Sequence, residues 1–223
     1  MRSETDTSPP VHGLAEQTAA ILRARITSGA GRPGQKLSEA GLATELQVSR
    51  NTLREGFRLL VQEGLLRHEP NRGVFIVAPS MASILDIYRV RRLIEVPAVA
   101  QGWPRHEGVA RMRAAVLRAE DAASVQDWRE VGSANMDFHA AIVALTDSPR
   151  LMRLFALLEA ELRLAFGLLP SPEALHEPYI RLNAAITARL EGGDPAGAAL
   201  MLADYLDQSE RTILAAFARL DEG

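Results

Sequence analysis

The sequence predicts a mainly α-helical protein in two parts: three helices with a β-hairpin, then an all-helical antiparallel bundle. Apolar residues recur at helical spacing along most of the chain. Only residues 64–77 carry short apolar runs of the kind that form strands. Clusters of Gly and Pro separate the helical runs. The composition agrees, because Ala, Leu and Arg are abundant and only 5% of residues are aromatic.

The first helix is expected at residues 14–27, where one apolar stripe runs along the segment. The stripe consists of Ala15, Ala19, Leu22 and Ile26, widened by Ile21. Residues 28–34 contain three glycines and a proline, so the helix cannot continue through them.

Two short helices and a hairpin follow. Ser38 can cap a helix from residue 39 to about 46, and Ser49 can cap another from residue 50 to about 62. Only two residues lie between these helices, a layout typical of a helix-turn-helix. Apolar runs on either side of a basic turn at residues 70–73 then predict a β-hairpin, which in this position is a wing.

The rest of the chain predicts six antiparallel helices joined by short connections. They are expected at about 81–102, 106–123, 125–146, 148–168, 174–191 and 195–220. The domain organisation follows: a flexible tail at 1–12, a winged helix-turn-helix DNA-binding domain at 13–78, a linker at 79–80, and a helical domain for effector binding and dimerisation at 81–223.

Composition excludes several classes of protein. The absence of cysteine rules out disulfides, cysteine-zinc sites and thiol catalysis. No run of 18 apolar residues is present and the first residues lack a signal-peptide pattern, so we expect a cytoplasmic protein with no membrane partner. The net charge is −3, yet residues 1–80 hold 10 Lys/Arg against 8 Asp/Glu. A mildly basic N-terminal part is compatible with a local DNA-binding surface.

The third helix has the features of a DNA-reading helix. Its arginines, Arg50, Arg54 and Arg58, are spaced four residues apart and share one face. Arginine forms bidentate bonds to guanine and also holds phosphates, and the N-terminal position favours Arg50 and Arg54 for base contacts. The opposite, apolar face has Leu53, Phe57, Leu60 and Val61.

Neighbouring polar residues extend this candidate interface. Ser49 and Thr52 can bond phosphate oxygens, and Asn51 reads an adenine or faces solvent. The alternative is that the three arginines form a solvated face balanced by Glu55 and Glu63.

The segment from residue 14 to 77 resembles the GntR family of regulators. The resemblance is carried by Pro33-Gly34-Gln35-Lys36-Leu37-Ser38-Glu39, Leu42-Ala43, Val48-Ser49-Arg50, Leu53-Arg54-Glu55, Leu59-Leu60 and Glu63-Gly64-Leu65. It implies that Arg50 and Arg54 contact DNA and that the wing glycine, Gly73, approaches the minor groove. Arg72, in the basic turn of the hairpin, is a further candidate DNA contact. A third family arginine position is occupied by Ala40, so that contact is expected to be absent.

The helical part resembles the FCD domain of the FadR branch. The segments that carry this resemblance are residues 86–95, Phe138-His139 and Ala185-Ile186 followed by Gly193-Asp194. Many such domains hold a divalent metal with one Asp and three His, but the corresponding residues here are Asn135, His139, Tyr179 and Tyr205. Amide and phenol groups replace these ligands poorly. We therefore expect no cofactor or metal, and a polar effector pocket instead. There are two alternatives. His139 is a core histidine whose hydrogen bonds are satisfied, or a metal is held through His176 in another helix register.

Arg91 is the candidate clamp for an effector carboxylate, as the family resemblance implies. Its alternative is a surface ion pair with Glu95 at i+4. Apolar pocket walls are expected from residues such as Leu93, Ile142 and Leu182.

These features together favour a sequence-specific transcriptional regulator. We expect a homodimer that binds a pseudo-palindromic operator on double-stranded DNA and represses until a small carboxylate or polar effector enters the helical domain. An enzyme using His139 with Asp137 or Tyr205 is the second class, but the sequence has no nucleophile motif or phosphate loop. An architectural DNA-binding protein without an effector is the third.

Overall fold

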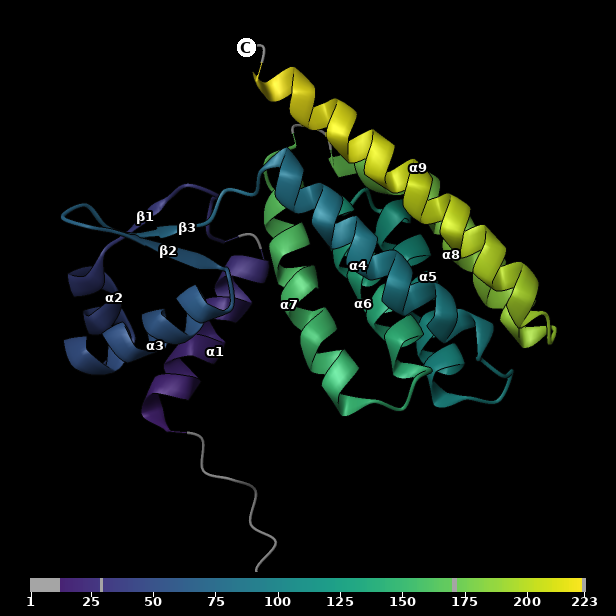
Figure 1. Cartoon of the computed structure of the whole chain (residues 1–223), viewed down its shortest axis with the longest axis horizontal. Coiled ribbons are helices and arrows are strands. Elements are labelled where there is room, and N and C mark those ends of the chain that lie inside the picture. Colours follow the sequence, from purple (N-terminus) through teal and green to yellow (C-terminus); the bar gives the residue numbers. More distant parts are fainter. Residues whose placement is uncertain (1–12, 29, 170–171, 222–223) are drawn as a thin grey trace, which may run out of the picture. The chain divides into compact units, whose positions relative to one another are not determined.

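The computed structural model describes residues 13–28, 30–169 and 172–221, which divide into two compact units at residues 1–77 and 78–223 (Figure 1). The tail expected at residues 1–12 lies outside the described residues. Within the described ranges, no helix has both the length and the apolar character that crossing a bilayer requires.

Three helices form the core of the N-terminal unit: α1 (Leu14–Thr27), α2 (Glu39–Glu45) and α3 (Arg50–Gln62). The predicted caps are present, because the Ser38 hydroxyl accepts from the backbone of Gly41 and the Ser49 hydroxyl accepts from that of Thr52. Between α2 and α3 the backbone of Gln47 has φ of 54°, which lets the chain reverse within a few residues. The predicted helix-turn-helix is therefore confirmed.

The wing is a three-stranded antiparallel sheet in the order β1-β3-β2. Strands β2 (Leu66–Glu69) and β3 (Gly73–Ile76) form the predicted hairpin. Strand β1 (Lys36–Leu37), which pairs with β3, was not predicted. Two residues are too few to show alternation, so only the partner strand defines β1.

Two residues assigned to the apolar faces of this unit are exposed. Ile21 and Val61 have exposed fractions of 46% and 38%, so the stripes of α1 and α3 are narrower than expected. The other predicted apolar residues Ala19, Leu53, Phe57 and Leu60 are buried. They form the core together with residues that include Leu65, just before β2, and Ile76 of β3.

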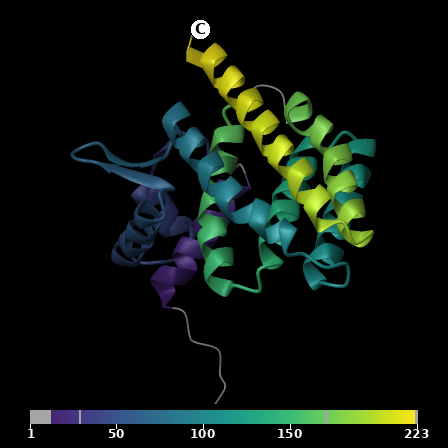
Figure 2. The ribbon, with the colours of Figure 1, turned by 45° about the vertical axis from the view of Figure 1, so that its right-hand side comes forward.

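The second unit is a helical bundle, as predicted. Its helices are α4 (Met81–Ala100), α5 (Glu107–Ser124), α6 (Trp128–Ala144), α7 (Pro149–Phe166), α8 (Pro172–Glu191) and α9 (Pro195–Asp221). The long helix α9 runs alongside α4 and α8, and α6 packs against α5, α8, α4 and α7 (Figure 2). The predicted bounds differ by up to three residues, because side-chain caps such as Asp127 at α6 set the starts.

The interior of the bundle combines a large apolar core with a group of buried polar side chains. Ile142 lies in the apolar core and Leu182 packs against it, whereas Leu93 has an exposed fraction of 76%. The prediction that Leu93 forms a pocket wall was therefore wrong. The buried polar residues include Arg91, Glu95, Asn135, His139 and Asn183.

Candidate functional site

The outer face of α3 presents the three arginines predicted to read DNA. Arg50, Arg54 and Arg58 are exposed, while Leu53 and Phe57 on the opposite face are buried. A groove of about 580 Å³ lies beside this helix, and its lining includes Arg54, Arg58, His68 and Val74. The helix therefore offers its cationic face to solvent next to a concave surface.

Carboxylates hold two of these arginines but leave the first one free. Arg54 Nε donates to Glu39 Oε2 at 2.9 Å, and Arg58 donates to Glu55 at 2.6 Å. The Arg50 side chain has no hydrogen bond or ion pair to any residue that the structure describes. The Arg50 guanidinium is therefore available to a new partner, whereas Arg54 would first have to leave its carboxylate.

Glu63 takes no part in balancing the arginines of α3. Its carboxylate is held by Arg23 of α1, whose Nε lies 2.7 Å from Glu63 Oε2. Of the two acids proposed to balance a solvated face, only Glu55 pairs with an arginine of α3. Glu39 was not predicted as a partner of these arginines, because it lies in α2 and the turn between α2 and α3 brings it next to Arg54.

Three polar residues predicted to contact DNA lie together at the start of α3. The hydroxyls of Ser49 and Thr52 lie 2.8 Å apart, and Ser49 caps the helix. Asn51 is exposed beside them. Exposed hydroxyls at a helix N-terminus, where backbone N–H groups are free, suit an anion such as phosphate.

A basic surface on the wing was only partly predicted. The Phe75 ring is approached by three cations: Lys36 Nζ at 6.0 Å, Arg67 Cζ at 5.2 Å and Arg72 Cζ at 5.6 Å from its centroid. Lys36 and Arg67 were missed, although both pair with Phe75 across the three strands. Gly73 begins β3 with φ of 107°, a conformation that favours glycine.

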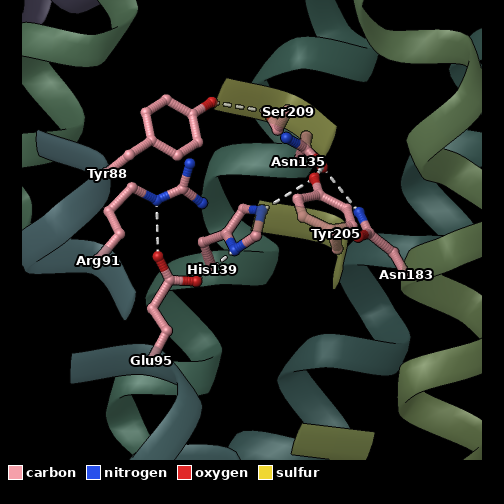
Figure 3. Close-up of polar contacts among 8 residues, drawn as sticks. All are labelled: Tyr88, Arg91, Glu95, Asn135, His139, Asn183, Tyr205 and Ser209. Carbon is pink, nitrogen blue, oxygen red and sulfur yellow. Dashed lines mark hydrogen bonds and ion pairs between the residues drawn. The ribbon is translucent and has the colours of Figure 1, made fainter. Parts of the chain in front are cut away.

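In the bundle, four of the five predicted effector residues share one hydrogen-bonded cluster (Figure 3). His139 Nε2 and Asn135 Oδ1 each lie 3.0 Å from the Tyr205 hydroxyl. Asn183 donates to Asn135 Oδ1 at 2.7 Å. The Tyr205 hydroxyl carries one proton, so it donates to one of its two neighbours at a time. Arg91 joins the cluster through a carboxylate described below.

Tyr179 is the fifth predicted residue, and it contributes only its ring. The ring centroids of Tyr179 and Tyr205 are 4.7 Å apart. The Tyr179 hydroxyl has no hydrogen bond among the described residues. Tyr179 therefore packs against the cluster without being linked into it.

Glu95 is the central residue of the cluster, and sequence reasoning misplaced it. Its carboxylate is completely buried, with Oε1 2.6 Å from Arg91 Nε and Oε2 2.6 Å from His139 Nδ1. The alternative given for Arg91, a surface ion pair with Glu95, is right in its partners and wrong in its location, because both residues face the interior of the bundle. Burial alone would raise the pKa of Glu95, and the neighbouring Arg91 and His139 lower it below the ordinary value.

Burial also affects the other groups of the cluster. Desolvation lowers the pKa of His139, with Glu95 opposing the shift, and so favours a neutral imidazole. The pKa of the Tyr205 hydroxyl is raised well above its usual range by desolvation. The Tyr88 hydroxyl lies 2.6 Å from Ser209, and burial raises its pKa to about 12. Arg91 and Glu95 are therefore the charged pair of the cluster at neutral pH.

A second buried acid lies next to this pair. Glu159 of α7 has a buried Oε1 without a hydrogen-bond partner among the described residues, and desolvation raises its pKa well above the ordinary value. Glu159, Arg91, His139, Met136 and Phe155 are among the residues lining a cavity of about 10 Å³. A space of that size holds about one water molecule.

The cluster does not fit a divalent metal. His139 is its only imidazole, its Nδ1 is bonded to Glu95, and its Nε2 faces a phenol hydroxyl. In the described part of the chain, no three His, Cys, Asp or Glu side chains are grouped so that they could hold an ion. His176, the alternative ligand, packs edge-on against Phe166 with centroids 5.5 Å apart, outside the hydrogen-bonded cluster.

Comparisons with known proteins match both units. The family described as bacterial regulatory proteins, gntR family, matches residues 14–76, and the FCD domain matches residues 86–208. A solved structure assigned to a GntR transcriptional regulator from Rhodococcus sp. RHA1 is 36% identical with a TM-score of 0.87, covering 91% of this chain and 98% of that one.

Curated relatives agree. The Nta operon transcriptional regulator of Aminobacter aminovorans is 26% identical over 163 residues, which are 72% of this chain and 77% of the relative. The gluconate operon transcriptional repressor of Bacillus subtilis is 39% identical over 74 residues, 33% of this chain and 30% of the relative.

The fold and the site therefore define a transcriptional regulator with a winged helix-turn-helix and a helical second domain. The chain belongs to the gntR family of bacterial regulatory proteins and carries an FCD domain. These families are regulators and not enzymes. Asp137, considered as a catalytic partner of His139, is bound by Arg118 at the surface.

Proposed function

We propose that the protein is a metabolite-responsive repressor that acts in the cytoplasm as a homodimer on a pseudo-palindromic operator. The observation that carries the proposal is the cationic outer face of α3, with Arg50 unpaired among the described residues and Arg54 beside it. In a dimer, two such helices can enter successive major grooves one helical turn apart. Repression is supported by relatives that carry that name.

The DNA contacts follow from the position of each side chain on the unit. Arg50 and Arg54, near the start of α3, are assigned to base edges, with Asn51 beside them. Ser49, Thr52 and Arg58 are assigned to phosphates, as is Arg72 of the wing, and Gly73 is assigned to the approach to the minor groove. Lys36 and Arg67 extend the phosphate-binding surface, because they lie with Arg72 around the same aromatic ring.

The buried polar cluster of the bundle is the proposed effector site, free of metal. An effector that is a small carboxylate or other polar molecule would meet Arg91, Asn135, His139 and Tyr205, with Tyr179 as an apolar wall. These residues come from α4, α6, α8 and α9, so a ligand among them contacts four helices at once. A ligand switches the protein only if it binds one arrangement of these helices better than another.

The cluster also distinguishes this proposal from an architectural DNA-binding protein. A bundle without a sensing role needs only an apolar core, because buried charges are costly unless they are paired. Here Arg91 and Glu95 are buried together in the interior of the bundle. Their retention favours a role beyond packing.

The experiment tests both operator binding and the release of the operator by an effector. A duplex selected from random DNA by the purified protein serves as the operator, and metabolites that raise the melting temperature are then added to the complex. We expect at least one stabilising metabolite to lower operator affinity, measured by fluorescence anisotropy. If the protein selects a duplex but no stabilising metabolite changes its affinity, the architectural alternative holds.

A further inference from the structure

Glu95 is held in the way that a bound carboxylate ligand would be held. One carboxylate oxygen lies 2.6 Å from a guanidinium nitrogen of Arg91, and the other lies 2.6 Å from an imidazole nitrogen of His139. Both oxygens are engaged and the side chain has no exposed surface. Arg91 and His139 are two of the residues proposed to receive an effector, so their facing nitrogens are already used.

The remaining space does not admit a second carboxylate. The cavity beside Arg91 and His139 has a volume of about 10 Å³, enough for about one water molecule. Formate, the smallest carboxylate, has three heavy atoms where a water has one. A free carboxylate can therefore bind the Arg91 and His139 nitrogens that face Glu95 only if the carboxylate of Glu95 does not occupy them.

The charges lead to the same result. Arg91 is the one cation of the hydrogen-bonded cluster drawn in Figure 3, and Glu95 neutralises it. The second carboxyl group nearby, Glu159, lines the same cavity, and its buried Oε1 has no hydrogen-bond partner among the described residues. A further anion added beside Glu95 would have no counter-ion, and an unpaired charge in a buried place is strongly disfavoured.

We infer that Glu95 is a tethered carboxylate that occupies the anion-binding position of the bundle, so that free carboxylates bind there only when Glu95 is removed. The inference rests on the proposed effector site and narrows its ligands. Of the two classes proposed above, it excludes the small carboxylate at Arg91 and His139 and leaves a polar effector that is neutral or cationic. The tether also links α4, which carries Arg91 and Glu95, to His139 on α6.

Chemical rescue tests the inference on the full chain. Glu95→Ala removes the carboxylate and leaves space beside an unpaired Arg91, so sodium formate should bind and stabilise this variant relative to sodium chloride at equal ionic strength. At ten times its dissociation constant, formate should raise the melting temperature by about 3–6 °C. The wild type should show no formate-specific shift.

Three further variants isolate the cause. Glu210→Ala combined with Asp207→Ala removes both carboxylates that pair with another arginine, Arg92, at a partly exposed site. Glu95→Gln fills the space without a charge, and Glu95→Ala combined with Arg91→Ala removes the cation. None of the three should respond specifically to formate.

Each outcome decides the question. A formate shift in the wild type equal to that in Glu95→Ala, or none in either, overturns the inference. If Glu95→Ala does not fold in chloride, recovery of folded protein only in formate supports the inference, and failure in both salts overturns it. These outcomes do not depend on DNA. The proposed function as a regulator is tested separately, by operator binding and by its release.

Discussion

Arg54 of α3 is held by Glu39 of α2, with Nε 2.9 Å from Oε2, so a carboxylate restrains one of the two arginines assigned to base edges. Arg50, one turn earlier, has no such partner among the described residues. An exposed ion pair of this kind is weak, and a phosphate can replace the carboxylate. We therefore expect the pair to limit indiscriminate DNA binding more than it stabilises the domain.

Glu39→Gln should strengthen binding to non-specific duplex DNA. The variant frees Arg54 for any nearby phosphate, so the slope of log K against log salt should steepen by about 0.9, the value for one additional phosphate contact. Anisotropy titrations over a salt series measure both quantities. Glu45→Gln, which removes the same charge from α2 but frees Arg25, is the matched control. Weaker non-specific binding by Glu39→Gln would show that Glu39 positions Arg54 instead.

Tyr205→Phe should destabilise the helical domain by about 1–3 kcal/mol, because His139 and Asn135 lose the hydroxyl that both contact. Tyr179→Phe is the control, since its hydroxyl has no hydrogen bond among the described residues. Urea unfolding followed by circular dichroism compares the two. Equal losses in both variants would mean that the hydroxyl network contributes nothing specific.

His176 should make stability depend on pH. Burial, helped by Arg163, lowers its pKa from 6.5 to about 4 in the folded protein. The folded state therefore resists protonation of His176. The contribution of the neutral His176 to the free energy of unfolding is complete above pH 6.5 and is lost as the pH falls towards 4. At pH 5 the loss is about 2 kcal/mol.

His176→Gln should remove this part of the loss. The measurement is the difference in unfolding free energy between pH 7.5 and pH 5 for the wild type and the variant, which cancels the effect of other buried groups such as His139. An identical pH dependence in the two proteins would contradict the assigned shift.

The purified protein should carry no stoichiometric zinc, nickel or manganese, because a phenol hydroxyl faces His139 Nε2 and Asn135 replaces a carboxylate. Elemental analysis by mass spectrometry after dialysis measures the content. About one ion per protomer, lost on His139→Ala, would show that the cluster accepts a metal after all.

The sequence predicted what depends on local patterns. Helical spacing and Gly/Pro breaks gave the helices to within three residues, and the caps Ser38 and Ser49 were correct. The sequence could not show which residues from distant parts of the chain pack against a given strand or side chain. Strand β1 exists only through pairing with β3. The i+4 spacing of Arg91 and Glu95 is the same in a surface pair and a buried one, and only the packing of α6 against α4 decides between them.

The candidate site shows the same division. Asn135, His139 and Tyr205 were grouped through the family resemblance, and the structure joins them by hydrogen bonds. Glu159 reaches the cavity from α7, a helix from which no site residue was predicted. Leu93 lies between Arg91 and Glu95 in the sequence, and it turns outward because α4 buries a different face.

The central claim is that α3 reads DNA through its first arginines, and operator affinity tests it most directly. Fluorescence anisotropy on the selected operator should show Arg50→Ala binding at least about tenfold more weakly than the wild type, equivalent to about 1.4 kcal/mol. Arg181→Ala, an exposed arginine of α8, should bind normally. Wild-type affinity in Arg50→Ala, with the salt dependence unchanged, would contradict the account.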